Sequence, residues 1–134
     1  MTSEFPIYLI GGRDDETAIF ALDEGDDGCE LSCSYRGKVI LVEADDYFDA
    51  LCEIRQRLAS EGLIPFCYGA SLNVYPSGMS RSMGGGLKAY RLTSGRQALM
   101  ADIVEIFAEG PDIIPASVEL QKKFFEEWLR SLGS

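Results

Sequence analysis

Four short segments with the patterning of β-strands follow one another in the first 43 residues, with only tight turns between them. They cover residues 5–10, 17–22, 30–35 and 38–43. In the third segment, apolar Leu31, Cys33 and Tyr35 alternate with polar residues, as expected of a strand with one buried face. Arg36-Gly37, between the last two segments, has the length of a two-residue hairpin turn. This arrangement predicts an antiparallel meander.

Two amphipathic helices are predicted later in the chain. The first is expected to be capped by Asp45, to run to about Ser60 and to be closed by Gly62. The second is expected to be capped by Ser117 and to run to about Leu132. Apolar residues recur at helical spacing in both, and we expect these stripes to face the core. The stripes are Tyr47, Leu51, Ile54 and Leu58, then Leu120, Phe124, Trp128 and Leu132.

Three further strands are predicted between the two helices. Residues 66–75 alternate over ten positions, and residues 87–92 are expected to be their hairpin partner. Residues 102–107 have strand-like composition, although a helix over 97–107 fits as well. Because alternating βαβ units are missing, the sequence predicts the α+β class. We expect one domain over residues 1–134, with an antiparallel sheet of about six or seven strands packed against two amphipathic helices.

The chain contains no histidine and four cysteines. Without histidine, Ser-His-Asp and Cys-His catalysis are excluded, and the commonest transition-metal ligand is missing. The cysteines lack CxxC pairs, so we expect reduced thiols that pack as small apolar residues rather than a zinc site. We therefore predict no catalytic residue, no metal site and no cofactor, and expect a protein that is not an enzyme.

The net charge of −10 is unevenly placed along the chain. Residues 1–61 carry fifteen acids and five bases, residues 62–101 carry four bases and no acid, and residues 102–134 carry seven acids and three bases. An acidic surface attracts basic proteins and repels nucleic acid and anionic membranes, although an acidic surface kept for solubility would show the same composition. The residues that we predict to bind a basic partner are Asp14, Asp15, Glu16, Asp23, Glu24, Asp26 and Asp27.

A second candidate site lies in the acid-free block, in a glycine-rich loop over residues 77–88. Glycines let backbone N–H groups turn toward an anion, and hydroxyl groups with an arginine suit a phosphate or a carboxylate. The loop matches neither the Walker A nor the Rossmann pattern, and a plain hairpin loop is the alternative. The residues predicted to bind an anion here are Asn73, Ser80, Arg81, Ser82, Gly84, Gly85 and Lys88.

Three aspartates gather near the start of the first predicted helix: Asp45, Asp46 and Asp49. Such a cluster could assist a metal-dependent hydrolysis. Acids are also expected at this place in any helix, because the N-terminal end of the helix dipole is positive. We therefore assign these residues to the helix rather than to a site.

In size and charge, the chain resembles the immunity proteins that neutralise bacterial polymorphic toxins, many of which bind basic nuclease toxins through acidic faces. The resemblance implies a non-catalytic inhibitor with a basic protein as its partner, binding neither nucleic acid nor membrane. The N-terminus lacks the pattern of a signal peptide and the apolar runs are too short to span a bilayer, so we expect a cytoplasmic protein. The alternative function is a small-ligand or anion-binding domain built on the loop at 77–88.

Overall fold

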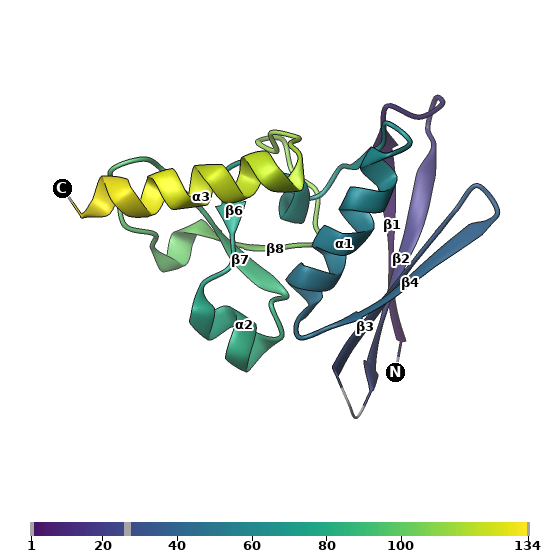
Figure 1. The fold of residues 1–134 in the computed structure, drawn as a ribbon, viewed down its shortest axis with the longest axis horizontal. Coiled ribbons are helices and arrows are strands. Elements are labelled where there is room, and N and C mark those ends of the chain that lie inside the picture. The colour runs from purple at the N-terminus through teal and green to yellow at the C-terminus, as the bar shows by residue number, and fades with distance from the viewer. Residues whose placement is uncertain (1, 26–27, 134) are drawn as a thin grey trace.

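The predicted α+β class is confirmed. The computed structural model describes residues 2–25 and 28–133, and within them eight strands form two antiparallel sheets, accompanied by three α-helices (Figure 1). One sheet has five strands in the order β4-β3-β2-β1-β5, and the other has three in the order β6-β7-β8. The strands are thus divided between two sheets.

The first four strands form the predicted meander. Arg36 and Gly37 have φ angles of 49° and 72°, which is the left-handed conformation that a type I′ hairpin turn requires at both central positions. Alternate side chains point into the core, as Phe20 and Leu31 do. The strands are β1 (Thr2–Ile10), β2 (Thr17–Gly25), β3 (Gly28–Tyr35) and β4 (Lys38–Ala44).

Helix α1 (Tyr47–Ala59) packs against β3 and β4, and all four residues of its predicted apolar stripe are buried. The cap is Asp46 rather than the predicted Asp45. An Asp46 side-chain oxygen accepts a hydrogen bond from the Asp49 N–H at 2.8 Å. The short strand β5 (Ile64–Pro65) then pairs with β1 at the far edge of the large sheet.

The prediction of a strand over residues 66–75 is wrong. The chain bends instead through a short 3₁₀ helix (Tyr68–Ala70) and becomes extended only in β6 (Val74–Tyr75). The Gly69 N–H donates to the Ile106 carbonyl oxygen at 2.9 Å, and a Cβ atom on Gly69 would lie 2.5 Å from Leu51. The close approach of α1 and residue 106 thus leaves little room for a Cβ atom at position 69, which alternating polarity could not reveal.

Residues 78–84, which we predicted as part of an irregular loop, form helix α2 (Gly78–Gly84). Ser77 caps this helix by accepting a hydrogen bond from the Ser80 N–H at 3.0 Å. Gly85 closes it with a φ of 66°. A cap and a closing glycine around only seven residues leave too little periodicity for a sequence pattern to indicate a helix.

Strand β7 (Lys88–Arg91) pairs with β6, as the predicted hairpin required. A short 3₁₀ helix (Met100–Asp102) leads into β8 (Ile103–Glu105), so the alternative of a helix over 97–107 is wrong. The last element is α3 (Val118–Leu132), which Ser117 caps as predicted by accepting a hydrogen bond from the Leu120 N–H at 3.1 Å.

The predicted apolar stripe of α3 is only partly correct. Leu120 is 56% exposed, whereas its polar neighbour Gln121 is buried. Phe124, Trp128 and Leu132 are half-buried as predicted, so the buried face is shifted toward Gln121 at the first turn only. Hydrogen bonds of Gln121 to the backbone of the bend at residues 69–71 account for this shift, because they take a polar side chain into the core.

The four cysteines are free thiols, as expected. Cys33 and Cys67 are buried, and burial raises the pKa of the Cys33 thiol to about 12 and that of Cys67 to about 11. Both therefore stay protonated near neutral pH and act as apolar core residues.

Candidate functional site

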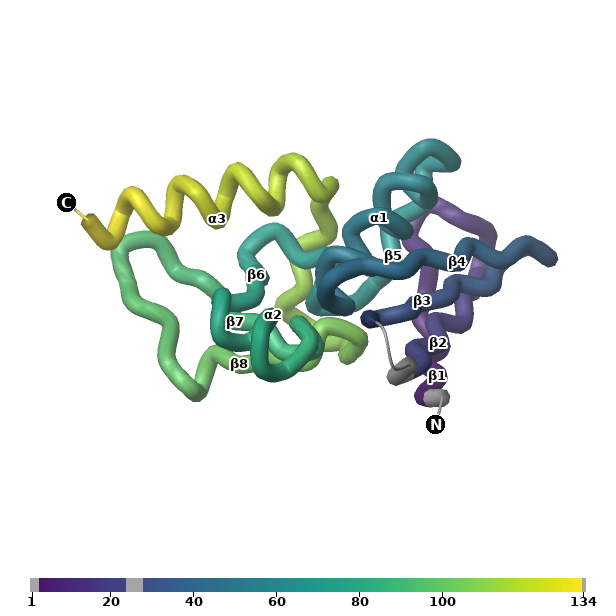
Figure 2. Tube along the Cα trace, turned by 60° about the horizontal axis from the view of Figure 1, so that its bottom comes forward, coloured from purple at the N-terminus to yellow at the C-terminus, as the bar shows by residue number. Residues whose placement is uncertain are grey.

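Helix α2 lies beside the three-stranded sheet and next to the start of α1, as Figures 1 and 2 both show. The Tyr47 N–H, at the first residue of α1, donates to the Gly85 carbonyl oxygen at 2.7 Å. This bond joins the end of one helix to the beginning of the other. Side chains of α2 therefore have two different neighbours, α1 on one side and β7 on the other.

Arg81 fixes α2 to the start of α1. Its NH1 atom lies 3.1 Å from an Asp46 carboxylate oxygen and 2.8 Å from one of Asp49. Its guanidinium also stacks over the rings of Phe48 and Tyr75, at 5.1 and 5.4 Å from their centroids. Burial acts to lower the pKa of Arg81, but the hydrogen bonds to Asp49 and Asp46 outweigh it, and the net pKa is raised. The charge of Arg81 is thus balanced by two carboxylates of the protein itself.

The other residues of the predicted anion site form hydrogen bonds within the protein, end helix α2, or are exposed. Gly84 and Gly85 form the end of α2, and Lys88 is exposed in β7. The remaining side chains make short-range hydrogen bonds. Ser80 Oγ donates to the Lys88 carbonyl oxygen, Ser82 Oγ donates to the Met79 carbonyl oxygen, and Asn73 Oδ1 accepts from Ser71 Oγ.

Two methionines project from α2 into solvent. Met79 is 71% exposed and Met83 is 82% exposed, and a spacing of four residues places them on the same side of the helix. They line a groove of about 450 Å³ together with Leu87, Tyr90 and Ile103. Flexible, polarisable methionine side chains adapt to apolar groups of different shapes, and exposed methionines recur on surfaces that bind peptides.

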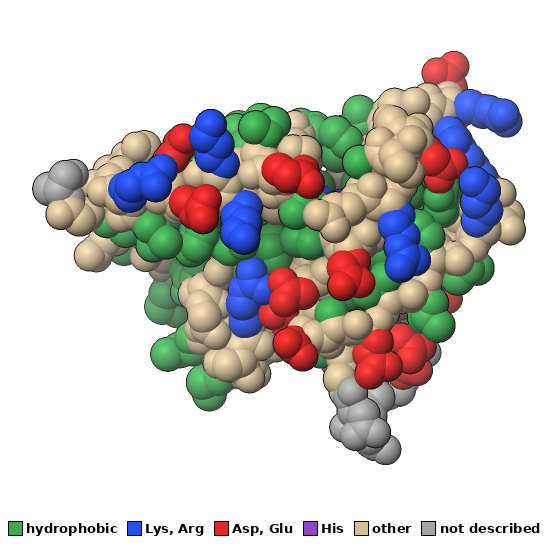
Figure 3. Space-filling view, in the orientation of Figure 1, with side chains coloured by type: hydrophobic (Ala, Val, Ile, Leu, Met, Phe, Trp, Pro, Cys, Tyr) green, Lys and Arg blue, Asp and Glu red, His purple; other side chains and the backbone are tan. Residues whose placement is uncertain are grey.

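An acidic hollow of about 370 Å³ lies at the junction of β4 and α1. Four carboxylates line it, those of Glu43, Asp45, Asp49 and Glu53, and no lysine or arginine does. Asp49 is paired with Arg81, whereas the other three form no ion pair with any residue of 2–25 or 28–133. Among residues 2–25 and 28–133, no group of three or more acids or cysteines is placed to hold a metal ion. Figure 3 shows the acidic side chains around the start of α1 and the adjoining end of the sheet.

The acidity continues across the large sheet from this hollow. Asp23, Glu30 and Glu43 are direct neighbours in register across β2, β3 and β4. Residues opposite one another in antiparallel strands point to the same face, and like charges in such pairs destabilise a sheet. A row of three carboxylates is therefore an unfavourable local arrangement that a cation from outside would relieve.

The structure divides the predicted partner-binding acids into two groups. Asp14, Asp15 and Glu16 lie in the connection between β1 and β2, while Asp23 is near the other end of β2. These positions are separated by about 25 Å, the length of seven to eight strand residues. Glu16 is also engaged, with its carboxylate 2.6 Å from Arg36 Nε. Glu24 belongs to the end of β2, and Asp26 and Asp27 lie outside the described residues.

Sequence reasoning selected none of the four acids of the hollow, Glu43, Asp45, Asp49 and Glu53, as site residues. Their membership in the acidic first 61 residues was a signal, but the helix start accounted for Asp45 and Asp49 and nothing distinguished the other two. The exposure of Met79 and Met83 was equally hidden, because a loop would have allowed them to pack locally. Folding the segment as a helix instead turns both side chains outward.

Comparison with known proteins gives no family model that matches the chain and no significant match to a curated protein. Within residues 2–25 and 28–133, no helix is long and apolar enough to cross a membrane.

Proposed function

We propose that this protein is a non-catalytic protein-binding module that binds a basic, amphipathic segment of a partner protein. The binding site, here named the α2 surface, consists of the methionine groove and the acidic hollow. It is defined by Met79, Met83, Leu87, Tyr90 and Ile103 in the groove, and by Glu43, Asp45, Asp49 and Glu53 in the hollow. Lys88 also lines the groove, so the lysines and arginines of the partner are expected on the side of the hollow.

The observation that carries this proposal is the position of the groove and the hollow on two sides of one short helix. Met79 and Met83 on α2 line the groove, while Arg81 of the same helix contacts Asp49, which lines the hollow. Apolar contacts in a groove supply most of the affinity of such interfaces, and charges select the partner and speed its approach. A segment with apolar residues on one side and lysine or arginine on the other would fit both parts.

An immunity-type inhibitor is the form of this function that size and charge support. The net charge of −10 favours a basic protein and disfavours nucleic acid and anionic membranes as partners. A bacterial, cytoplasmic protein that neutralises a basic toxin would meet these conditions. An anion site at residues 77–88 has less support, because Arg81 is paired with Asp46 and Asp49.

Titration with a defined peptide tests the proposal. The probe is a synthetic helical peptide with leucine and lysine at amphipathic spacing, and its control replaces each lysine with glutamate. We expect saturable shifts of the ε-methyl NMR signals of Met79 and Met83, with Met100, which does not line the groove, as the internal reference. Affinity for the lysine peptide should fall as salt rises, because surface charges are screened.

Charge-neutralising variants separate specific from general attraction. Asp45→Asn with Glu53→Gln should weaken binding of the lysine peptide and reduce its salt dependence. Glu126→Gln with Glu127→Gln removes the same charge from an exposed part of α3 and should leave binding nearly unchanged. Equal binding of the glutamate peptide, or shifts that spare both methionines, would contradict the proposed function.

A further inference from the structure

Arg55 is a buried cation that forms no ion pair with any residue that the structure describes. Its side chain leaves α1 toward the start of α3, and the residue is 3% exposed. NH1 donates to the Gly69 carbonyl oxygen at 3.0 Å and to Gln121 Oε1 at 2.6 Å, and NH2 donates to the Ala116 carbonyl oxygen at 2.9 Å. These acceptors are neutral, and NH1 also lies 3.9 Å from the Cys52 Sγ atom. Burial lowers the pKa of Arg55, while the charge of the nearby Glu119 acts to raise it. A buried charge is costly unless an opposite charge compensates it.

One edge of the Arg55 guanidinium remains available. Its Nε–H forms no hydrogen bond with any residue that the structure describes, whereas NH1 and NH2 both do. Every fully buried side-chain nitrogen or oxygen of those residues has a hydrogen-bond partner. Nε must therefore be open to the space beside it rather than enclosed.

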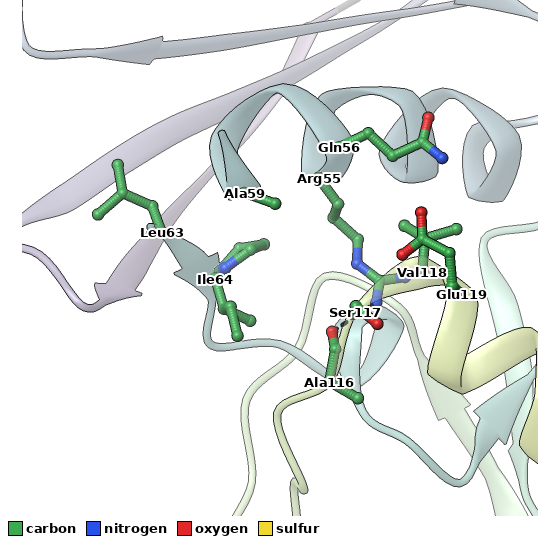
Figure 4. A pocket seen from close by; sticks show the side chains of 10 residues that line it. Arg55, Gln56, Ala59, Leu63, Ile64, Ala116, Ser117, Val118 and Glu119 are labelled. Atoms are coloured by element: carbon green, nitrogen blue, oxygen red, sulfur yellow. Dashed lines mark hydrogen bonds between the residues drawn. The ribbon is translucent and has the colours of Figure 1, made fainter. Parts of the chain in front are cut away.

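That space is a small cavity between α1, β5 and the start of α3 (Figure 4). Its volume is about 140 Å³, close to that of the cavities of about 150 Å³ that hold benzene, so about six heavy atoms would fit. Apart from Arg55, most of its walls are apolar. The apolar residues are Ala59, Leu63, Ile64, Pro65, Ala116 and Val118.

Gln56 of α1 and the first turn of α3 form the remaining wall. Ser117, Val118 and Glu119 line the cavity there. Ser117 Oγ accepts the Leu120 N–H, and the first backbone N–H groups of a helix have no partner within the helix. These groups and the helix dipole favour a negative charge. A second positive feature thus lies beside the open edge of Arg55.

We propose that this cavity binds a small carboxylate that carries a short aliphatic group. The carboxylate would accept hydrogen bonds from Arg55 Nε and the start of α3, and the aliphatic group would pack on Ala59 and Ile64. Apolar walls disfavour phosphate and sulfate, whose oxygens need hydrogen bonds on every side. None of the residues that define the α2 surface lines this cavity, so the two sites can be tested separately.

Glu119 opposes this binding. It is exposed and lines the mouth of the cavity, where its carboxylate repels an anion. Glu119→Gln should therefore tighten carboxylate binding by about two- to fivefold, the range expected for one charge at a helix terminus. The variant leaves the hydrogen bonds of Arg55 intact.

The test follows the ¹H–¹⁵N signal of Arg55 Nε and the amide signals of Val118 and Glu119 while propionate is added. We expect saturable shifts confined to these groups, and none with sulfate at equal ionic strength. Ala59→Leu fills the cavity while keeping the hydrogen bonds of Arg55 NH1 and NH2 and should abolish the shifts, whereas Ala101→Leu, at an exposed alanine away from the cavity, should not. These variants avoid replacing Arg55, whose loss would leave the Gly69 and Ala116 carbonyl oxygens and Gln121 Oε1 without this donor.

A second probe identifies the source of the carboxylate. Acetyl-glycyl-alanine carries the same group at the end of a peptide chain. Tighter binding of propionate would assign the cavity to a free acid, and tighter binding of the peptide would assign it to a chain terminus. Absence of shifts with both probes, or shifts that persist in Ala59→Leu, would overturn the proposal.

Discussion

Some charged side chains form ion pairs within the molecule, whereas others form none with any described residue. Arg36, Arg81 and Arg91 each contact at least one carboxylate. Around the acidic hollow, Asp49 is the acid held in this way, and the other carboxylates face solvent unpaired by any described residue. A lysine or arginine from another protein would therefore meet carboxylates that need not first give up a partner.

The stabilisation of the fold by Glu16 is predicted to depend on pH over a defined range. The hydrogen bond from the Arg36 side chain, and then that from the Arg13 N–H, lower its pKa from 4.5 to about 2. Because the folded-state pKa is below the unfolded one, the stabilisation is present above about pH 4.5 and is lost as the pH falls through about 2. We expect Glu16→Gln to lower the melting temperature at neutral pH, and this difference to shrink across that range.

Circular dichroism melting curves across this pH range provide the measurement. Glu4→Gln is the matched control, because Glu4 is exposed and forms no ion pair with the described residues. The difference between Glu4→Gln and wild type should be small at every pH. A Glu16→Gln effect that stays constant down to about pH 2 would show that the pair with Arg36 is not its cause.

At the scale of single elements, local sequence signals identified those elements that local interactions determine. Alternation and the Arg36-Gly37 turn predicted the meander, and Ser117 predicted the start of α3. The bend at residues 66–73 was missed because it depends on Gly69 meeting Leu51 and Ile106, which are distant in sequence. The burial of Gln121 in place of Leu120 was missed for a similar reason, since it depends on the hydrogen bonds of Gln121 to the distant bend.

The candidate site was predictable only in part. Sequence reasoning placed a candidate site in a loop over residues 77–88, whereas residues 78–84 form a helix and the pairing of Arg81 with α1 depends on a tertiary contact. It also grouped Asp14 with Asp23, which a hairpin strand holds far apart. Composition can thus indicate that a surface is acidic, whereas strand geometry decides which acids lie together.

The order of helix α2 is predicted to depend on the contacts of Arg81 with α1. Seven residues are too few for a stable helix in isolation, so its order must come from its contacts. Arg81→Met removes hydrogen bonds to two carboxylates, and the loss of charge-assisted bonds worth about 1.5 kcal/mol should speed exchange of α2 amides by roughly tenfold. The amide of Arg81 itself, which donates to the Ser77 carbonyl oxygen, is a suitable reporter in the wild type and control.

Hydrogen exchange measured by NMR tests this dependence. Lys88→Met is the control, since it removes an equal charge from an exposed neighbouring position with no ion pair to the described residues. Amides of α2 should exchange at nearly the wild-type rate in Lys88→Met. Unchanged exchange in Arg81→Met would mean that other contacts order the helix.

For the whole molecule, the uneven charge along the sequence becomes an uneven surface. The acidic first 61 residues form most of the large sheet and α1, while the acid-free residues 62–101 supply α2 and two strands of the small sheet. Contact between α2 and α1 brings an apolar groove beside the acidic residues. Surfaces of this kind associate quickly with basic partners, at rates that fall with ionic strength.

Quantitative affinity capture with three forms of the protein tests most directly whether the α2 surface binds a partner. The forms are wild type, the double variant Met79→Ser with Met83→Ser, and Met100→Ser, which changes an equally exposed methionine outside the groove. We predict that a basic protein is captured by wild type and by Met100→Ser, less at higher salt, and is lost with the double variant. Undiminished capture of that protein by the double variant would contradict the proposed role of the α2 surface.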